Sequence, residues 1–442
     1  MDANWLSMSM ADLGRGIGAG QIDPVALTRT YLDAIAASPV AGRIYARVTA
    51  DRALTEAAAA QRRVEAGQRL GLLDGVPVSW KDLFDSAGVA TEAGSALLKG
   101  RVPARDARVL ANAATAGLVC LGKTHMSELA FSGLGVNPIT ATPPCVNDPG
   151  AAPGGSSSGA AASVAFNLAP CGIGSDTGGS VRIPSAWNDL VGLKTSHGRL
   201  STRGVVPLVA SFDTVGPLCR SVEDAALMLG VLEGAAAPDL RGASLQGTRF
   251  LVLENGLDDA RDGPMSGFDR AVGRMVEAGA ELRHQRLTCV DEALSLSGVL
   301  FTTEAYATWR DQIEAQPDLM FGEIRERFRS GGQFSGVEFI RAWQRLRMLR
   351  VEFHKLIAGY DAVLLPSSPI LPPNLERLET DSEYYVTENL LALRNTRVGN
   401  LMGSAGVSLP TGVPSTGLMI LTPPGSDHRL LRLAAAAERA LA

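Results

Sequence analysis

The sequence predicts an α/β protein with one large, parallel or mixed central sheet and a helical insertion in its C-terminal half. Between residues 23 and 279, short apolar segments typical of strands alternate with segments whose pattern is typical of helices. Residues 300–360 are richer in aromatic and charged side chains and have a helical pattern. Strand-like segments return after residue 360. We therefore expect residues 1–442 to form a single domain.

The individual elements follow from local signals. A first helix is predicted at 23–37, because Asp23 is a good N-cap and Pro24 suits the first helical position. The first half of the chain should also hold a helix at 50–66, a strand at 75–82, a helix at 106–116, a strand at 118–122, and helices at 124–131 and 160–166. Strands are further expected at 169–174, 250–253, 361–365, 405–409 and 418–421, with one helix ending near 279 and a closing helix from about 428. Residues 235–247 are expected to be a surface connection.

Composition excludes several classes of protein. Hydrophobic residues make up 46% of the chain and charged residues 20%, which leaves little room for extended disorder. A net charge of -5, without a cluster of Lys and Arg, argues against a nucleic-acid partner. The segment 323–329 is rich in arginine but also holds glutamates, so it is predicted to be a solvated helix face. No run of about 18 apolar residues is present, which argues against a membrane span.

Cysteine usage and the first residues predict a cytoplasmic location. The five cysteines are odd in number and widely spaced, with no CxxC pair, as in proteins whose cysteines stay reduced. Neither they nor the five histidines have the spacing of a zinc site. The first 16 residues have neither the basic start nor the apolar stretch of a secretory signal. We expect no metal and no cofactor.

The most unusual segment is residues 153–180, which hold seven glycines and six serines but only one charged residue, Asp176. The predicted helix and strand at its centre distinguish it from a flexible linker. Its second turn, residues 176–180, reads DTGGS, and two adjacent glycines leave successive N–H groups open to approach. Such a turn can form an oxyanion hole beside a nucleophilic hydroxyl group.

A serine nucleophile in this turn would need a base, and the usual histidine is missing, since only His197 is near. A lysine made neutral by burial or a relay through a second hydroxyl group could replace it. Lys81, at the end of a predicted strand, offers the first, although a lysine at a strand end is often a surface residue. The cluster Ser156, Ser157 and Ser158 offers the second.

Three motifs in order resemble the amidase signature family: GVPVSWKD around Lys81, GGSSSG at 154–159 and DTGGSVRIP at 176–184. The resemblance covers roughly residues 20 to 435 and is strongest at 75–230. It continues through the segments GLK at 192–194, GVVPL at 204–208 and FDTVGPL at 212–218. It implies a large mixed central sheet covered by helices on both faces, and a substrate wall formed by the variable helical region at about 300–360.

The resemblance also implies a catalytic triad of Ser, cis-Ser and Lys. Matched residue by residue, Ser180 would be the nucleophile, Ser156 the bridging serine preceded by a cis peptide bond, and Lys81 the base. The oxyanion hole would be lined by the backbone N–H groups of four residues, Thr177, Gly178, Gly179 and Ser180.

Other residues have more than one interpretation. Ser157 and Ser158 either hydrogen-bond the triad or cap the following helix. Asp176 either bonds its own backbone or Arg182, or gives polar support to the triad. By resemblance, a further set would contact the substrate: Ala130, Phe131, Ser132 and Gly155.

These observations predict an amidohydrolase acting on a small or medium carboxamide. The aromatic residues Phe131, Phe301, Tyr306 and Trp309 suggest a partly hydrophobic substrate. The alternative within the family is the A subunit of a glutamyl-tRNA amidotransferase complex. A nucleotide-binding module is a distant alternative, because neither turn reads GxxxxGK[ST] or GxGxxG. Homodimerisation is left open.

Overall fold

The computed structural model describes residues 3–442, so Met1 and Asp2 lie outside the described residues. Its centre is a sheet of 11 strands in the order β1-β3-β2-β4-β6-β5-β10-β11-β9-β7-β8. The strands are β1 (Tyr45–Val48), β2 (Pro77–Lys81), β3 (Val119–Thr124), β4 (Cys171–Asp176), β5 (Val191–Lys194), β6 (Thr214–Cys219), β7 (Arg249–Leu253), β8 (Glu281–Gln285), β9 (Ala362–Pro366), β10 (Ala405–Pro410) and β11 (Gly417–Thr422).

The sheet is mixed, as the sequence predicts. Parallel pairs lie on both sides of its centre: β2 pairs with β3 and β4, and β7 pairs with β8 and β9. The strands between them, from β4 through β6, β5, β10 and β11 to β9, pair antiparallel. The parallel neighbours β2 and β4 end at the same edge of the sheet, which brings Lys81 and Asp176 to one region.

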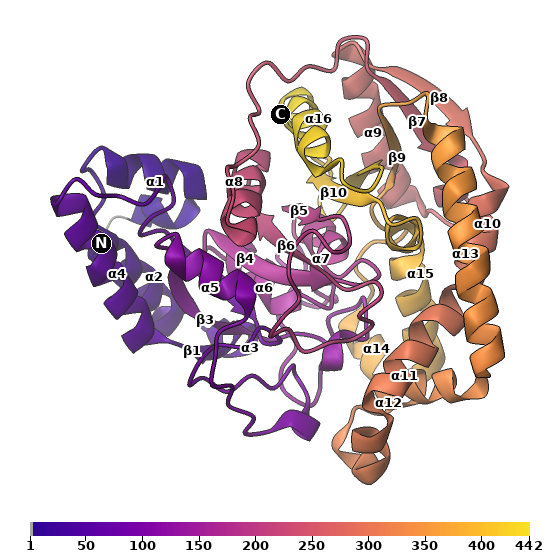
Figure 1. Ribbon diagram of the computed structural model, residues 1–442, viewed down its shortest axis with the longest axis horizontal. Coiled ribbons are helices and arrows are strands. Elements are labelled where there is room, and N and C mark those ends of the chain that lie inside the picture. Colours follow the sequence, from indigo (N-terminus) through magenta and orange to yellow (C-terminus); the bar gives the residue numbers. More distant parts are fainter. Residues whose placement is uncertain (1–2) are drawn as a thin grey trace.

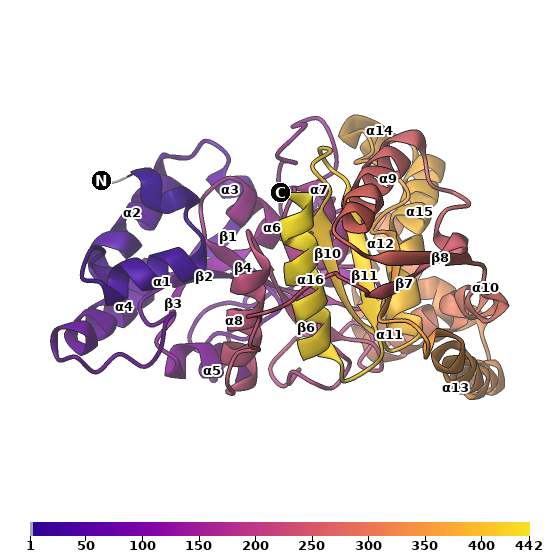
Figure 2. The ribbon, with the colours of Figure 1, turned by 90° about the horizontal axis from the view of Figure 1, so that it is seen from above.

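Helices cover both faces of the sheet (Figures 1 and 2). The α-helices are α1 (Met10–Gly18), α2 (Pro24–Ala37), α3 (Ala41–Ile44), α4 (Ala50–Glu65), α5 (Arg108–Thr115), α6 (Ser158–Ala165), α7 (Arg182–Trp187), α8 (Val222–Glu233), α9 (Asp262–Glu277), α10 (Thr288–Ser295), α11 (Ser297–Ala315), α12 (Gly322–Arg329), α13 (Gly336–Ile357), α14 (Leu375–Thr380), α15 (Ser382–Leu401) and α16 (Asp427–Leu441). Short 3-10 helices are η1 (Ala3–Ser7), η2 (Ala96–Leu98), η3 (Glu128–Ala130), η4 (Glu254–Gly256), η5 (Pro317–Leu319) and η6 (Ser330–Gln333).

The N-terminal helices and the helical insertion lie at opposite ends of the molecule. In both views α1, α2 and α4 occupy the indigo end, and α11 and α13 occupy the orange end (Figures 1 and 2). The main cluster of buried apolar side chains nevertheless runs through the whole chain, from Met10 to Leu441. Within residues 3–442, no helix is long and apolar enough to cross a membrane.

Local signals define where two helices begin, and the signal for α2 was expected from the sequence. Asp23 caps α2 by accepting a hydrogen bond from the Ala26 N–H at 2.7 Å, and Pro24 is its first residue. The long helix α13 begins with a capping box in which Ser335 and Glu338 bond each other's backbone N–H groups.

One predicted element is wrong. Residues 124–131 were expected to be helical, but β3 continues to Thr124 and only Glu128–Ala130 forms a 3-10 turn. Leu129 and Ala130 have positive φ values of 45° and 62°, which no right-handed α-helix contains. The chain instead makes a tight corner here, and this corner brings Ala130 and Phe131 to the cavity described below.

Candidate active site

Lys81 is the last residue of β2 and its side chain is completely buried. Its amine donates hydrogen bonds to Ser156 Oγ at 2.7 Å and to Ser175 Oγ at 2.9 Å. Burial lowers the pKa of Lys81 from 10.5 to about 7, against the opposing effect of Asp176 and Asp213. A large fraction of this amine is therefore neutral near pH 7 and able to accept a proton.

Ser156 lies in the first glycine and serine turn, and the peptide bond between Gly155 and Ser156 is cis, as the resemblance implies. The side chain of Ser156 is buried and contacts Lys81. The next residue ties this turn to the second one, because the Ser157 N–H donates to the Ser180 carbonyl oxygen at 3.2 Å. The three candidate catalytic residues are thus linked through one continuous set of contacts.

Ser180 lies in the second turn, between β4 and α7, and the Asp176 carboxylate accepts hydrogen bonds from the backbone of this turn. Asp176 Oδ1 accepts from the Gly179 N–H at 2.9 Å, and its Oδ2 accepts from the Val181 N–H at 3.1 Å. The fully buried Arg182 donates to both oxygens, at 2.8 and 3.0 Å. Burial alone would raise the pKa of Asp176, but the charge and hydrogen bonds of Arg182 bring it well below its ordinary value. Asp176 therefore supports the site through the backbone and Arg182, without contacting Lys81 directly.

The oxyanion-hole prediction needs one correction. The Gly179 N–H already donates to Asp176, so it is not free to meet an oxyanion. Within the described residues, the N–H groups of Thr177, Gly178 and Ser180 have no hydrogen-bond partner. Gly179 has a different role: its φ is 142°, and a Cβ there would lie 2.1 Å from Thr396 Oγ1. This glycine permits the close approach of the turn to α15.

Ser157 and Ser158 do not cap α6 with their side chains. Ser157 is at the N-cap position but makes no side-chain capping bond, and its hydroxyl donates to the Ser175 carbonyl oxygen at 3.2 Å. The buried Ser158 hydroxyl has no hydrogen-bond partner among the described residues. The Ser157 hydroxyl thus bonds the backbone of Ser175, which is a hydrogen-bond partner of Lys81, and it bonds no residue of the candidate triad.

A small cavity of about 20 Å³ opens directly on Ser180. Ala130, Phe131 and Ser132 line it. Thr177 and Gly178 also line it, and they belong to the second turn, residues 176–180, which we call the oxyanion turn. Gly155 does not line it, contrary to expectation. Its N–H donates to the Gly133 carbonyl oxygen at 2.7 Å, and a Cβ there would lie 2.5 Å from the Gly135 nitrogen, so Gly155 packs against the 133–135 loop.

A second cavity, of about 390 Å³, has Phe301, Arg327 and Arg397 in common with the first and therefore lies next to it. It lies among α11, α12 and α15, the helices at the orange end of Figure 1. Its wall combines residues of the helical region at about 300–360 with residues of α15, which lies outside that region. Two of the four aromatic residues expected near the substrate bond other groups. Tyr306 bonds Glu314 and Trp309 bonds the Pro207 carbonyl oxygen, and neither lines these cavities.

The sequence did not indicate several residues of the site. Ser175, the second partner of Lys81, lies in the strand β4, where a serine carries no distinctive pattern. Arg327 lies within 323–329, which was expected to be a solvated face, yet its guanidinium donates to the Phe131 carbonyl oxygen at 3.0 Å and lies over the Phe131 ring. Arg397 comes from α15, far from Ser180 in sequence. The sequence gives one weak signal for Arg397: no Asp or Glu lies three or four residues away, where it could pair with the arginine on a helix. Arg327 gives no such signal, because Glu323 lies four residues before it.

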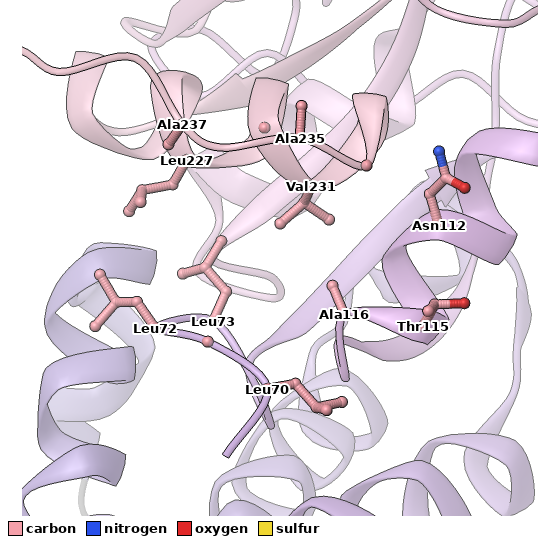
Figure 3. A pocket seen from close by; sticks show the side chains of 13 residues that line it. Leu70, Leu72, Leu73, Asn112, Thr115, Ala116, Leu227, Val231, Ala235 and Ala237 are labelled. Carbon is pink, nitrogen blue, oxygen red and sulfur yellow. The ribbon is translucent and has the colours of Figure 1, made fainter. Parts of the chain in front are cut away.

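Another cavity of about 420 Å³ lies elsewhere, where α5 and α8 face the loop before β2 (Figure 3). Leucine, valine and alanine side chains such as Leu70, Leu73 and Val231 form most of its wall, and no titratable side chain lines it. It therefore offers no group for acid or base catalysis. Within residues 3–442, no group of three or more His, Cys, Asp or Glu side chains is placed to hold a metal ion.

Comparison with known proteins agrees with this architecture. The family model described as Amidase matches residues 26–431. The chain is 36% identical to 2-amino-5-chloromuconic acid deaminase of Comamonas testosteroni, over 87% of this chain and 85% of the relative. It is 33% identical to the A subunit of glutamyl-tRNA(Gln) amidotransferase from Acidothermus cellulolyticus, over 97% of this chain and 93% of the relative.

Solved structures show the same fold. A crystal structure described as an amidase superposes with a TM-score of 0.89 at 29% identity, covering 98% of this chain and all (100%) of the other. The native peptide amidase of Stenotrophomonas maltophilia gives 0.82 at 27% identity, covering 98% and 96%. Together with the family match, these findings define a hydrolase that acts on carbon–nitrogen bonds. The chain belongs to the amidase signature family.

Proposed function

We propose that this protein hydrolyses a small or medium, partly hydrophobic carboxamide through an acyl-enzyme on Ser180, with Ser156 and Lys81 as a proton relay. The observation that carries the proposal is the buried Lys81 amine, 2.7 Å from Ser156 Oγ and with a pKa of about 7. A lysine in this state can act as a base where no histidine is present.

The first half of the reaction forms the acyl-enzyme. Ser180 Oγ attacks the amide carbonyl carbon while its proton passes to Ser156 Oγ, and the Ser156 proton passes to neutral Lys81. The carbonyl oxygen becomes negative and accepts hydrogen bonds from the free N–H groups of Thr177, Gly178 and Ser180. The carbon–nitrogen bond then breaks, and the leaving nitrogen takes the proton back from Lys81 through Ser156.

The second half releases the acid. A water molecule attacks the ester on Ser180, and its proton passes to Lys81 by the same route. The bond between the acyl carbon and Ser180 Oγ breaks, and Ser180 regains a proton through Ser156. The cycle ends with the carboxylic acid product, the amine and the starting protonation state.

Two features support a partly hydrophobic substrate that fits this site. Phe131 and Phe301 line the small cavity, and the outer cavity of about 390 Å³ has the size of a small-molecule pocket. A cytoplasmic location and homodimerisation remain predictions, the first supported by five free, buried cysteines.

The A subunit of an amidotransferase remains the alternative, because the similarity to such a protein spans nearly the whole chain. The two functions differ in their need for a partner. We expect the purified chain alone to release ammonia or amine from a panel of carboxamides, anilides and hydrazides. Ser180→Ala should remove this activity without loss of fold, measured by circular dichroism. Turnover that depends on added partner proteins would favour the alternative, and turnover by Ser180→Ala would exclude Ser180 as the nucleophile.

A further inference from the structure

Two arginines face the reaction cavity without a carboxylate partner. Arg327 and Arg397 line both the small cavity at Ser180 and the outer cavity. Neither forms an ion pair with a described residue, although the other cavity wall residues include two glutamates. The only hydrogen bond of the Arg327 guanidinium is to the Phe131 carbonyl oxygen, and Arg397 has none among the described residues.

The two glutamates of the same cavity are occupied by other groups. Glu326 bonds Arg325 at 2.9 Å and Arg329 at 3.0 Å, so it is paired on its own helix. Glu323 accepts a hydrogen bond from the Ser382 hydroxyl. Neither glutamate forms an ion pair with Arg327 or Arg397.

Such an arrangement is costly for a folded protein, because partly buried charges lose hydration and like charges repel. Burial lowers the pKa of Arg327 to about 10, and burial together with the charge of Arg327 lowers the pKa of Arg397 to about 9. Both guanidinium groups nevertheless stay charged at neutral pH. A bound anion would relieve the repulsion and supply the missing hydrogen-bond acceptors.

A third donor points to the same ligand chemistry. Asn389 lines the outer cavity, and its Oδ1 accepts from the Gly133 N–H at 2.9 Å. This bond fixes the orientation of the amide group, so Nδ2 is the remaining donor, and it has no partner among the described residues. Guanidinium and amide N–H groups match the planar oxygens of a carboxylate.

We propose that Arg327 and Arg397, assisted by Asn389, bind a carboxylate of the substrate, so that the enzyme acts on amides that carry a carboxylate away from the scissile bond. The inference rests on the proposed function of the Ser180 site, whose substrate class it specifies. Because the arginines lie where the two cavities meet, a substrate held there can present its amide to Ser180 and extend its remainder into the outer cavity.

The test is a binding measurement that does not depend on turnover. Ser180→Ala protein is titrated by calorimetry with malonamate, succinamate, glutaramate and adipamate, and with the neutral diamide of each chain length. We expect at least one of the four carboxylates to bind about tenfold or more tightly than its diamide, since charge-assisted bonds are lost in the diamide. No binding by any of the four carboxylates, or equal binding of each matched pair, would overturn the proposal.

Variants of Arg327 and Arg397 test whether these two residues cause the tighter binding of carboxylates. In the Ser180→Ala background, Arg397→Gln should bring the ratio of carboxylate to diamide affinity close to one, and it should fold because Arg397 has no hydrogen bond to a described residue to lose. Arg327→Gln should act in the same direction, and Arg241→Gln is the matched control, since Arg241 is 91% exposed and pairs with Asp239. A ratio unchanged by Arg397→Gln would contradict the assignment.

The proposed function is tested separately with wild-type protein and the same eight compounds. Carboxylate binding without ammonia release from any amide would count against the acyl-transfer function, while the arginine pair would remain a carboxylate site. Ammonia release at equal kcat/KM from carboxylates and diamides would count against the carboxylate site alone.

Discussion

Lys81 is suited to act as a base because of where the sheet places it. The side chain is fully buried at the end of β2. Within residues 3–442, its hydrogen-bond partners are two serine hydroxyl groups and no carboxylate. Desolvation therefore dominates and lowers the pKa to about 7. A surface lysine would be protonated at neutral pH and could not accept a proton from Ser156.

The pH dependence of activity should report this lysine. Because neutral Lys81 is the active form in the proposed mechanism, kcat/KM should rise with pH through about 7 and level off above it. Lys81→Met should reduce kcat/KM by about 10²- to 10⁴-fold. Steady-state ammonia release between pH 5 and 9 measures both effects.

Lys194 provides a matched control, since it is also fully buried and burial also lowers its pKa to about 7. Among the described residues, its amine donates only to the carbonyl oxygens of Thr195 and Ser404. Lys194→Met should therefore keep the rise in activity near pH 7. If Lys194→Met lost the rise in activity near pH 7 and a weakly active Lys81→Met kept it, Lys81 would not be the base.

Burial of Lys81 also makes stability depend on pH. Its folded pKa of about 7 lies below the ordinary value of 10.5, so the unfolded chain binds more protons between these values. The free energy of unfolding contributed by this group therefore rises with pH from about 7 to 10.5. In urea unfolding, this part of the slope should be missing in Lys81→Met, and an identical slope in the variant would contradict the depressed pKa.

Ser175 should position and tune Lys81. Its Oγ accepts a hydrogen bond from the amine, which favours the protonated form, so its removal should lower the pKa of Lys81 further. Ser175→Ala is expected to shift the rise in kcat/KM to lower pH and to reduce kcat by about tenfold. A loss of activity without any shift would mean that Ser175 acts only through packing.

Among single residues, local motifs predicted only part of the site. Lys81, Ser156 and Ser180 each lie in a short stretch with an unusual pattern of glycine, serine and charge. Arg327 lies among paired charges on α12, and only the fold reveals that it turns toward Phe131. Sequence gives no means to tell which arginine of such a helix lacks a partner.

At the scale of elements, the oxyanion turn depends on α15. Thr396 on this helix donates to the Gly178 carbonyl oxygen at 2.7 Å, and Asn400 donates to Asp176 Oδ1 at 3.0 Å. Arg182 joins the two by donating to Asp176 and to the Thr396 carbonyl oxygen. The turn is therefore held by a helix far away in sequence.

A pair of glycine substitutions tests this contact. Gly179→Ala should lower the free energy of unfolding by about 2 to 5 kcal/mol and remove activity, because φ is 142° and the new Cβ would meet Thr396 Oγ1. Gly178→Ala should cost less than about 1 kcal/mol, since its Cβ would meet no atom closer than 3.7 Å. Urea unfolding measures both, and equal losses would show that α15 does not pack as closely as described.

Some elements were predicted from the sequence, and others were missed, among them β6 and α8. The apolar strands β7, β9 and β11 were expected near their actual positions. The edge strand β8 was missed because its sequence ELRHQ is polar and largely exposed, with no alternation. The helix expected at 124–131 failed because tertiary contacts impose positive φ values on Leu129 and Ala130.

At the scale of the whole molecule, the site combines distant parts of one chain. The proposed triad comes from the first 180 residues, whereas the wall of the outer cavity comes from α11, α12 and α15. The alternation of elements predicted the sheet, but the pairing of β5 with β10 joins the two halves and is a long-range contact that no local pattern indicates.

The proposed mechanism uses only groups of this chain, so the purified protein should not need an added metal ion. Incubation with a chelator followed by its removal is expected to leave kcat/KM unchanged, within the error of the assay. Inactivation that is reversed by a divalent cation would contradict the relay of Ser156 and Lys81.

The most direct test of the central claim is to trap the acyl-enzyme. Protein mixed with a slowly hydrolysed anilide is quenched in acid and analysed by mass spectrometry of its peptides. We predict an added acyl mass on Ser180, none in Ser180→Ala, and none on Ser156 in either protein. Turnover with the acyl group on another residue, or with Ser180→Ala still active, would contradict the account.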